Sequence, residues 1–125
     1  MSNDFIDVFQ TLKGVLARVA KSFAVGSDSA VEYKLVTLTP SPFPQHKGHP
    51  MDFGTVRIGK AYVSFHLMPL YMCAPLNEKI SPRLKKRMQG KTCFNFKAAP
   101  EPELIADLTL LTEAALEQWK RQKWI

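Results

Sequence analysis

The stretch from Gly54 to Lys97 most constrains what this chain can fold into, because two strand patterns, a helix start and a third strand follow one another there almost without spacers. It begins with GTVRIGKAYVSFHLMPLYM and ends with ISPRLKKRMQGKTCFNFK. Strands joined by tight turns pair antiparallel, so the stretch predicts an antiparallel sheet with a short basic helix inserted before its last strand. It carries no catalytic or metal-binding motif. The sequence therefore predicts an architecture and leaves the activity open.

A tight hairpin is predicted at Gly59-Lys60, since a two-residue loop that begins with glycine suits the primed turn types. The loop fixes the register, and the register places alternate side chains on opposite faces of the sheet. The predicted pairs on the apolar face are Ile58 with Ala61, Val56 with Val63, and Gly54 with Phe65. Those on the second, mixed face are Arg57 with Tyr62, Thr55 with Ser64, and Phe53 with His66.

Apolar residues at spacings of three and four predict a long helix at each end of the chain. Ser81 and Pro82 suit the start of a short helix, and Gly90 is expected to end it as a left-handed C-cap. The buried stripe of the C-terminal helix is predicted to be Leu104, Leu108, Leu111, Ala115 and Trp119. The predicted elements are a helix over 4–23, a turn over 26–29, strands over 33–39, 52–58, 61–68 and 91–97, a proline-rich loop over 40–50, and helices over 82–89 and 100–123.

These elements predict an α+β fold in which the two terminal helices pack on the apolar face of a single antiparallel sheet. A length of 125 residues suits one domain over 1–125. The other face of the sheet would be open to water. The side chains expected on that face are Thr55, Arg57, Tyr62, Ser64, His66, Cys93, Asn95 and Lys97.

Positive charge is concentrated from Lys79 to Lys97, where seven basic residues occur without an acidic one in a chain of formal net charge +6. Phosphates and other anions are therefore expected partners, and weak nucleic-acid binding is an alternative. A solvated basic helix that serves solubility alone is the other interpretation. The basic patch comprises Arg83, Lys85, Lys86, Arg87 and Lys91.

His66 is the strongest single candidate on the mixed face, because an imidazole in mid-strand can donate to an anion. A hydrogen-bonded surface histidine without a further role is the alternative. Arg57 and Tyr62 would supply directed donors for a phosphate or carboxylate. A hydrolytic triad of Ser64, His66 and Asp52 is not expected, because Asp52 is predicted on the opposite face. The predicted ligand-binding residues are Arg57, Tyr62, Ser64, His66, Asn95 and Lys97.

Three further patterns allow two interpretations each. His46 and His49, with Asp52 following, would form a loop metal site or be ordinary loop residues, and no metal site is predicted from them. Cys93 is either a thiol with a lowered pKa or a buried inert one. The apolar segment after the hairpin is either a dimer contact or one end of the core, so a monomer and a homodimer both remain open; its residues are Leu70, Tyr71, Met72 and Leu76.

No apolar run approaches the roughly 20 residues of a membrane-spanning helix, and the N-terminal residues lack the pattern of a secretory signal, so a cytoplasmic protein without membrane contact is expected. Cys73 and Cys93 show neither CxxC nor Cys/His spacing, which favours plain thiols. Stacking of single-stranded nucleic acid would depend on Tyr62 and Phe53, since Phe94 and Phe96 are predicted core residues.

The hairpin GTVRIGKAYVSFHLMPLYM and the segment SPRLKKRMQGKTCFNFK together resemble the YdhG-like family, small bacterial domains of unknown function. The resemblance implies a frataxin-like fold, with terminal helices packed on an antiparallel sheet. It also implies an alternative role as an iron chaperone, for which carboxylates on the first helix would be needed; Asp4 and Asp7 are the candidates there. Our main hypothesis is a binding or accessory module without enzymatic activity or a cofactor, which uses the open sheet face for a small anionic ligand or a protein partner.

Overall fold

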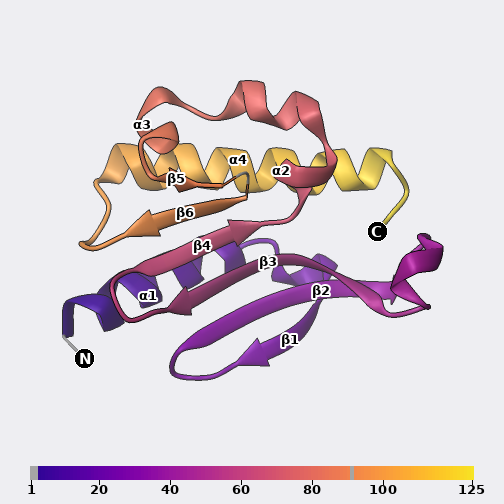
Figure 1. The fold of residues 1–125 in the computed structure, drawn as a ribbon, viewed down its shortest axis with the longest axis horizontal. Coiled ribbons are helices and arrows are strands. Elements are labelled where there is room, and N and C mark those ends of the chain that lie inside the picture. The colour runs from indigo at the N-terminus through magenta and orange to yellow at the C-terminus, as the bar shows by residue number, and fades with distance from the viewer. Residues whose placement is uncertain (1–2, 91) are drawn as a thin grey trace.

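The computed structural model describes residues 3–90 and 92–125. Figure 1 shows the course of the chain through two long helices, a sheet and several short helical turns. The elements are α1 (Asn3–Ala17), η1 (Ala20–Ser22), β1 (Ala24–Asp28), β2 (Glu32–Pro40), η2 (Pro44–His46), β3 (Pro50–Ile58), β4 (Val63–Leu67), α2 (Pro69–Met72), η3 (Ala74–Lys79), α3 (Pro82–Lys85), β5 (Met88–Gln89), β6 (Cys93–Phe96) and α4 (Pro102–Arg121).

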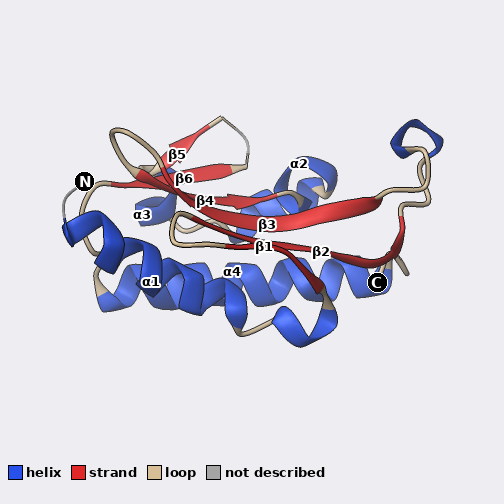
Figure 2. Cartoon of the chain, turned by 90° about the horizontal axis from the view of Figure 1, so that it is seen from below, coloured by secondary structure: helices blue, strands red, loops and turns tan. Residues whose placement is uncertain are grey.

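The strands form one six-stranded sheet in the order β1-β2-β3-β4-β6-β5, and every neighbouring pair is antiparallel. Both terminal helices, α1 and α4, lie on the same side of this sheet (Figure 2). The predicted α+β class, with N- and C-terminal helices on an antiparallel sheet, is confirmed. No helix among the described residues is long and apolar enough to cross a membrane.

The core lies between the sheet and the two terminal helices. Phe53 of β3 stacks on Phe23, with ring centroids 4.2 Å apart, and meets the ring of Trp119 edge-on at 5.4 Å. The predicted stripe of α4 is confirmed, because each of its members is buried: Leu104, Leu108, Leu111, Ala115 and Trp119.

The N-terminal helix is shorter than predicted and a strand replaces the predicted turn. α1 ends at Ala17, and η1 carries the chain to Phe23, whose side chain is still buried. The helical spacing of apolar residues therefore continues through a 3₁₀ turn, which periodicity alone does not distinguish from an α-helix. β1 follows as an edge strand, with an irregular step in its pairing to β2 at Gly26.

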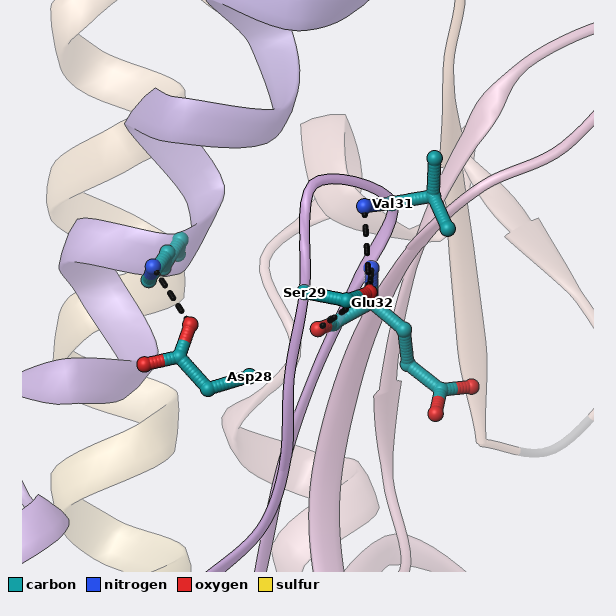
Figure 3. Close-up of polar contacts among 5 residues, drawn as sticks. Asp28, Ser29, Val31 and Glu32 are labelled. Carbon is teal, nitrogen blue, oxygen red and sulfur yellow. Dashed lines mark hydrogen bonds and ion pairs between the residues drawn. The ribbon is translucent and has the colours of Figure 1, made fainter.

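Side-chain contacts fix the turn between β1 and β2 (Figure 3). The hydroxyl of Ser29 accepts hydrogen bonds from the backbone N–H groups of Val31 at 3.3 Å and Glu32 at 3.1 Å. Such a serine-centred turn gives the chain a local partner for its free amides. The ammonium group of Lys13 in α1 pairs with Asp28 at 2.9 Å, which connects the helix to this end of the sheet.

The predicted register of the β3–β4 hairpin is wrong by two residues. The connection spans four residues, 59–62, and the N–H of Gly59 donates to the carbonyl of Tyr62 at 2.8 Å. Tyr62 therefore lies in the turn and not opposite Arg57. A shift of two residues keeps each side chain on its predicted face, because strand side chains alternate with period two. The observed pairs are Ile58 with Val63, Arg57 with Ser64, Val56 with Phe65, Thr55 with His66, and Gly54 with Leu67.

A β-bulge in β3 reverses the predicted positions of Phe53 and Asp52. The pairing with β2 steps from Leu35 opposite Gly54 to Val36 opposite Asp52, so Phe53 is the additional residue. Phe53 and Gly54 are both buried, and Phe53 is not on the mixed face as predicted. Asp52 is exposed, and counting back across the bulge places it on the face that carries Thr55.

The predicted basic helix ends early, and its last residues form a strand. Ser81 caps α3 as predicted, since its hydroxyl accepts from the N–H of Leu84 at 3.3 Å. The helix stops at Lys85, and β5 pairs with β6. Gly90 has the predicted positive φ of 76°, but it lies in the turn of this hairpin and does not cap a helix. Met88 pairs with Phe94 of β6, and its side chain packs against the core from this strand position.

The proline-rich loop agrees with its prediction, whereas the segment after β4, which was expected to be irregular, forms the helical turns α2 and η3. The long loop lies between Pro40 and Pro50 and contains the single turn η2. In the segment after β4, Leu70 and Leu76 are buried, so these two residues close one end of the core and are not a free dimer surface. Tyr71 between them is exposed.

We expect Gly54→Ala to lower the free energy of unfolding by about 1–3 kcal/mol, which is typical of an overpacked core. An added Cβ would lie 2.8 Å from Cδ1 of Leu16 and 3.2 Å from the backbone oxygen of His66. Gly14→Ala is the matched control, because nothing lies within 4 Å of a Cβ at that helical position. The control should gain up to about 1 kcal/mol from helix propensity. Urea unfolding measures both, and equal midpoints would contradict the expectation.

Candidate functional site

The face of the sheet away from α1 and α4 carries two rows of polar side chains across β3, β4 and β6. Strand pairing places residues of the three strands directly opposite one another. Four of the six predicted ligand-binding residues lie in these rows. The first row is Thr55, His66 and Cys93, and the second is Arg57, Ser64 and Asn95.

A basic hollow of about 330 Å³ lies beside the second row. Within the described residues, its lining carries three cationic groups and no carboxylate. Its neutral polar groups come from the β3–β4 turn and the β5–β6 hairpin, where the side-chain amide of Asn95 donates to Gln89. The hollow is lined by Tyr62, Lys86, Arg87, Met88, Gln89, Asn95 and Lys97. It thus combines Tyr62, Asn95 and Lys97 of the predicted binding set with two residues of the basic patch.

Among the described residues, Arg83 and Lys85 of the basic patch lie outside the lining of this hollow. Arg83 pairs with Asp107 of α4 at 2.9 Å, so its charge is partly compensated. Lys85 is exposed on α3, and the predicted patch residue Lys91 lies outside the described residues. The guanidinium carbon of Arg87 lies 5.8 Å from the centre of the Phe96 ring, a cation–π contact that restricts its orientation.

His66 lies in a cluster with Cys93 of β6 and with Thr92, the residue before that strand. Its Nδ1 is 3.0 Å from Sγ of Cys93 and 3.1 Å from the hydroxyl oxygen of Thr92. All three residues are half-buried. The alternation of β6 placed Cys93 on this face, but its contact with His66 depends on the pairing of strands that are far apart in sequence.

The electrostatic surroundings of His66 keep its imidazole neutral. Burial is the larger effect and lowers the pKa of His66 below its ordinary value of 6.5, while the nearby carboxylate of Asp52 acts in the opposite direction and raises it. Asp52 reaches this face because of the β-bulge, which sequence reasoning missed. A neutral imidazole at pH 7 can accept a proton from a neighbouring thiol or hydroxyl.

Within the part of the chain that the structure describes, neither Ser64 nor Arg57 lines the basic hollow. Ser64 lies opposite Asn95 in the second row, one strand away from Arg57. Arg57 is exposed and does not line the basic hollow. The structure therefore places four of the predicted residues in or next to two local sites, and leaves Arg57 of β3 and Ser64 of β4 beside them on the same face of the sheet.

A larger, mostly apolar cavity of about 410 Å³ lies between the proline-rich loop and α2. Its lining includes His46, His49 and Asp52, the three residues that the sequence suggested as a possible loop metal site. His46 is engaged with Ser41, whose hydroxyl oxygen is 2.6 Å from Nδ1. Among the residues that the structure describes, no group of three or more His, Cys, Asp or Glu side chains is arranged to hold a metal ion. The side chain of Asp4 lies outside the described residues. The remaining lining residues are Phe43, Gln45, Pro50, Met51, Met68, Tyr71 and Met72.

Comparisons of the chain with family models, with curated proteins and with solved structures each found no match. The resemblance to the YdhG-like family therefore stays a prediction from the quoted segments. The candidate sites rest on the geometry of this chain alone.

We expect the imidazole of His66 to titrate below pH 6.5 in the folded protein, because burial disfavours its charged form. Replacement of Asp52 by Asn removes the effect that opposes burial and should lower the midpoint further. The chemical shift of the His66 ring proton, followed by NMR from pH 8 to pH 4 (roughly the range in which histidines titrate), measures both. A midpoint above 6.5 in either protein would contradict this.

The same shift links protonation to stability. Between the lowered folded pKa and the unfolded value of 6.5, the unfolded chain binds a proton that the folded chain does not. The contribution of His66 to the free energy of unfolding is therefore fully present above pH 6.5 and decreases as the pH falls below that value. We expect His66→Gln to show a shallower loss of unfolding free energy over that acidic range than the parent protein, as measured by urea unfolding at a series of pH values. Identical slopes would contradict the linkage.

Proposed function

We propose that this protein is a small binding module that holds an anionic ligand, of the phosphate or carboxylate class, in the basic hollow. The observation that supports the proposal is the arrangement of Lys86, Arg87 and Lys97 around one hollow, with no carboxylate among its described lining residues. Charge-assisted hydrogen bonds from such groups are stronger than those between neutral groups. The sequence alone had suggested an anionic ligand on this face.

The neutral groups of the hollow would orient the ligand. Tyr62 offers a phenol, and Gln89 and Asn95 offer amides that already contact each other. Arg87 is held near the Phe96 ring, so less side-chain freedom is lost when it binds. A volume of about 330 Å³ is at the lower end of small-molecule sites and suits a compact ligand.

Nucleic-acid binding through the basic segment has less support than binding of a small anion. A single-stranded nucleic acid needs exposed aromatic rings on which its bases can stack. Phe53, Phe94 and Phe96 are buried, and Tyr62 is half-buried. The ion pair of Arg83 with Asp107 also reduces the positive charge available on α3.

The iron-chaperone role that the family resemblance implies remains a separate hypothesis. Hard cations prefer clustered carboxylates, and the lining of the basic hollow offers none among its described residues. An iron site would therefore have to lie elsewhere in the molecule, so ferrous iron is a useful second probe in the same assay.

We expect pyrophosphate to raise the melting temperature of the protein, because a ligand that binds the folded state alone stabilises it. Lys97→Gln should weaken binding about 3–10-fold, from the loss of roughly 1 kcal/mol for a solvent-exposed ionic contact. Lys21→Gln is the control with the same change of charge, at an exposed position in η1. It should bind pyrophosphate like the parent protein. Thermal shift and calorimetric titration provide the two readouts.

Three results would argue against the hollow. Equal weakening by the two lysine variants would show a general charge effect. Stabilisation by ferrous iron and not by pyrophosphate would favour the chaperone hypothesis. A short single-stranded oligonucleotide that binds more tightly than pyrophosphate, with a steep dependence on salt, would favour nucleic acid as the ligand.

A further inference from the structure

The pair formed by His66 and Cys93 has the geometry of a base beside a nucleophile. Sγ of Cys93 lies 3.0 Å from Nδ1 of His66, within hydrogen-bonding distance for a thiol donor. The two residues are direct neighbours across β4 and β6, so the sheet itself fixes their separation. Both residues are half-buried, so the pair is not enclosed in the core.

The chemical state of the pair suits proton transfer from sulfur to nitrogen. Burial lowers the pKa of His66, so the imidazole is neutral at pH 7 and Nδ1 is free to accept the thiol proton, although the same burial makes it a weaker base. The carboxylate of Asp52 favours the imidazolium that results, since it acts to raise the same pKa. The thiolate is the reactive form of cysteine, and an adjacent base is a common means of producing it. Thr92 also contacts Nδ1, at 3.1 Å, and can help to orient the ring.

The second cysteine of the chain provides an internal comparison. Cys73 is a free thiol with 4% of its surface exposed, and burial raises its pKa. Cys73 is therefore shielded from solvent, and the side chain that acts on its thiol is Trp119, which is not a base. The two thiols should differ strongly in reactivity.

We propose that Cys93 is a nucleophilic thiol, activated by His66, that undergoes exchange with small-molecule disulfides. His66 takes the thiol proton, and the Cys93 thiolate attacks one sulfur of the disulfide. A bond forms between the two sulfurs while the original sulfur–sulfur bond breaks, and the second half of the reagent leaves as a thiolate that takes the proton back from His66. Cys93 is oxidised and the leaving sulfur is reduced, so no further oxidant is needed.

The neighbouring basic hollow gives the exchange a charge preference, a part of the inference that rests on the proposed function. Gln89, which lines the hollow, lies directly opposite Cys93 in the β5–β6 pairing. Asn95 lies two residues further along β6 on the same face and also lines the hollow. An anionic disulfide held there would have its sulfur atoms near Cys93, so it should react faster than a neutral one.

The experiment measures exchange rates of the full chain with two chromogenic reagents, the neutral dithiodipyridine and the dianionic dithiobis(nitrobenzoate). In the native protein we expect one fast thiol, which disappears in Cys93→Ser and is retained in Cys73→Ser. His66→Gln should slow the reaction with the neutral reagent at least about tenfold at neutral pH, a smaller factor than the roughly 100-fold or more that a positioned general base commonly contributes. Intact mass should show one adduct per chain.

Free cysteine under the same conditions is the reference rate. Because the native protein is compared with it directly, the test of Cys93 activation does not depend on whether a variant folds. Reaction of Cys93 with the neutral reagent more slowly than free cysteine, or an unchanged rate in a folded His66→Gln protein, would overturn the inference. The ratio of the anionic to the neutral rate tests the hollow separately. If Lys97→Gln leaves that ratio unchanged while the neutral rate stays high, the activated thiol is supported and the proposed anion site is not.

Discussion

The packing of Phe53 is the contact on which the arrangement of the two layers depends. Its ring touches Phe23, which follows the first helix, and Trp119 of the last helix, at centroid distances of 4.2 and 5.4 Å. Aromatic pairs of this kind contribute about 0.5–1.5 kcal/mol each beyond the area that they bury. One side chain of β3 thereby holds both ends of the chain on the same side of the sheet, and the opposite face is left to polar residues.

The β-bulge that turns Phe53 toward the core also builds the candidate site. An additional residue at this position places Asp52 on the polar face, where its charge acts on His66. A regular strand would have separated the two, since alternation would carry Asp52 to the other face. The polar face thus carries two neighbouring local environments. One is the hydrogen-bonded group of His66, Thr92 and Cys93, and the other is the cationic hollow beside Asn95.

Several parts of the structure were predictable because they follow from local rules. The stripe of α4, the Ser81 cap and the positive φ of Gly90 each reflect the chemistry of a few adjacent residues. The hairpin register was wrong by two residues, yet the faces of its strands were right, because period two survives an even shift. The predicted binding residues Asn95 and Lys97 line one hollow because they are two positions apart on the segment of β6, and Tyr62 reaches the same hollow from the turn.

The sequence by itself determined the fold class, the buried stripe of the last helix and the polar character of one sheet face, because periodicity and composition act within short segments. Only the tertiary structure decided which side chains on that face meet. The contact of His66 with Cys93 requires β4 and β6 to pair across an intervening segment, and the position of Asp52 requires an irregular residue in β3. Both result from the packing of distant segments around one core, where the free energy of burial outweighs local preference.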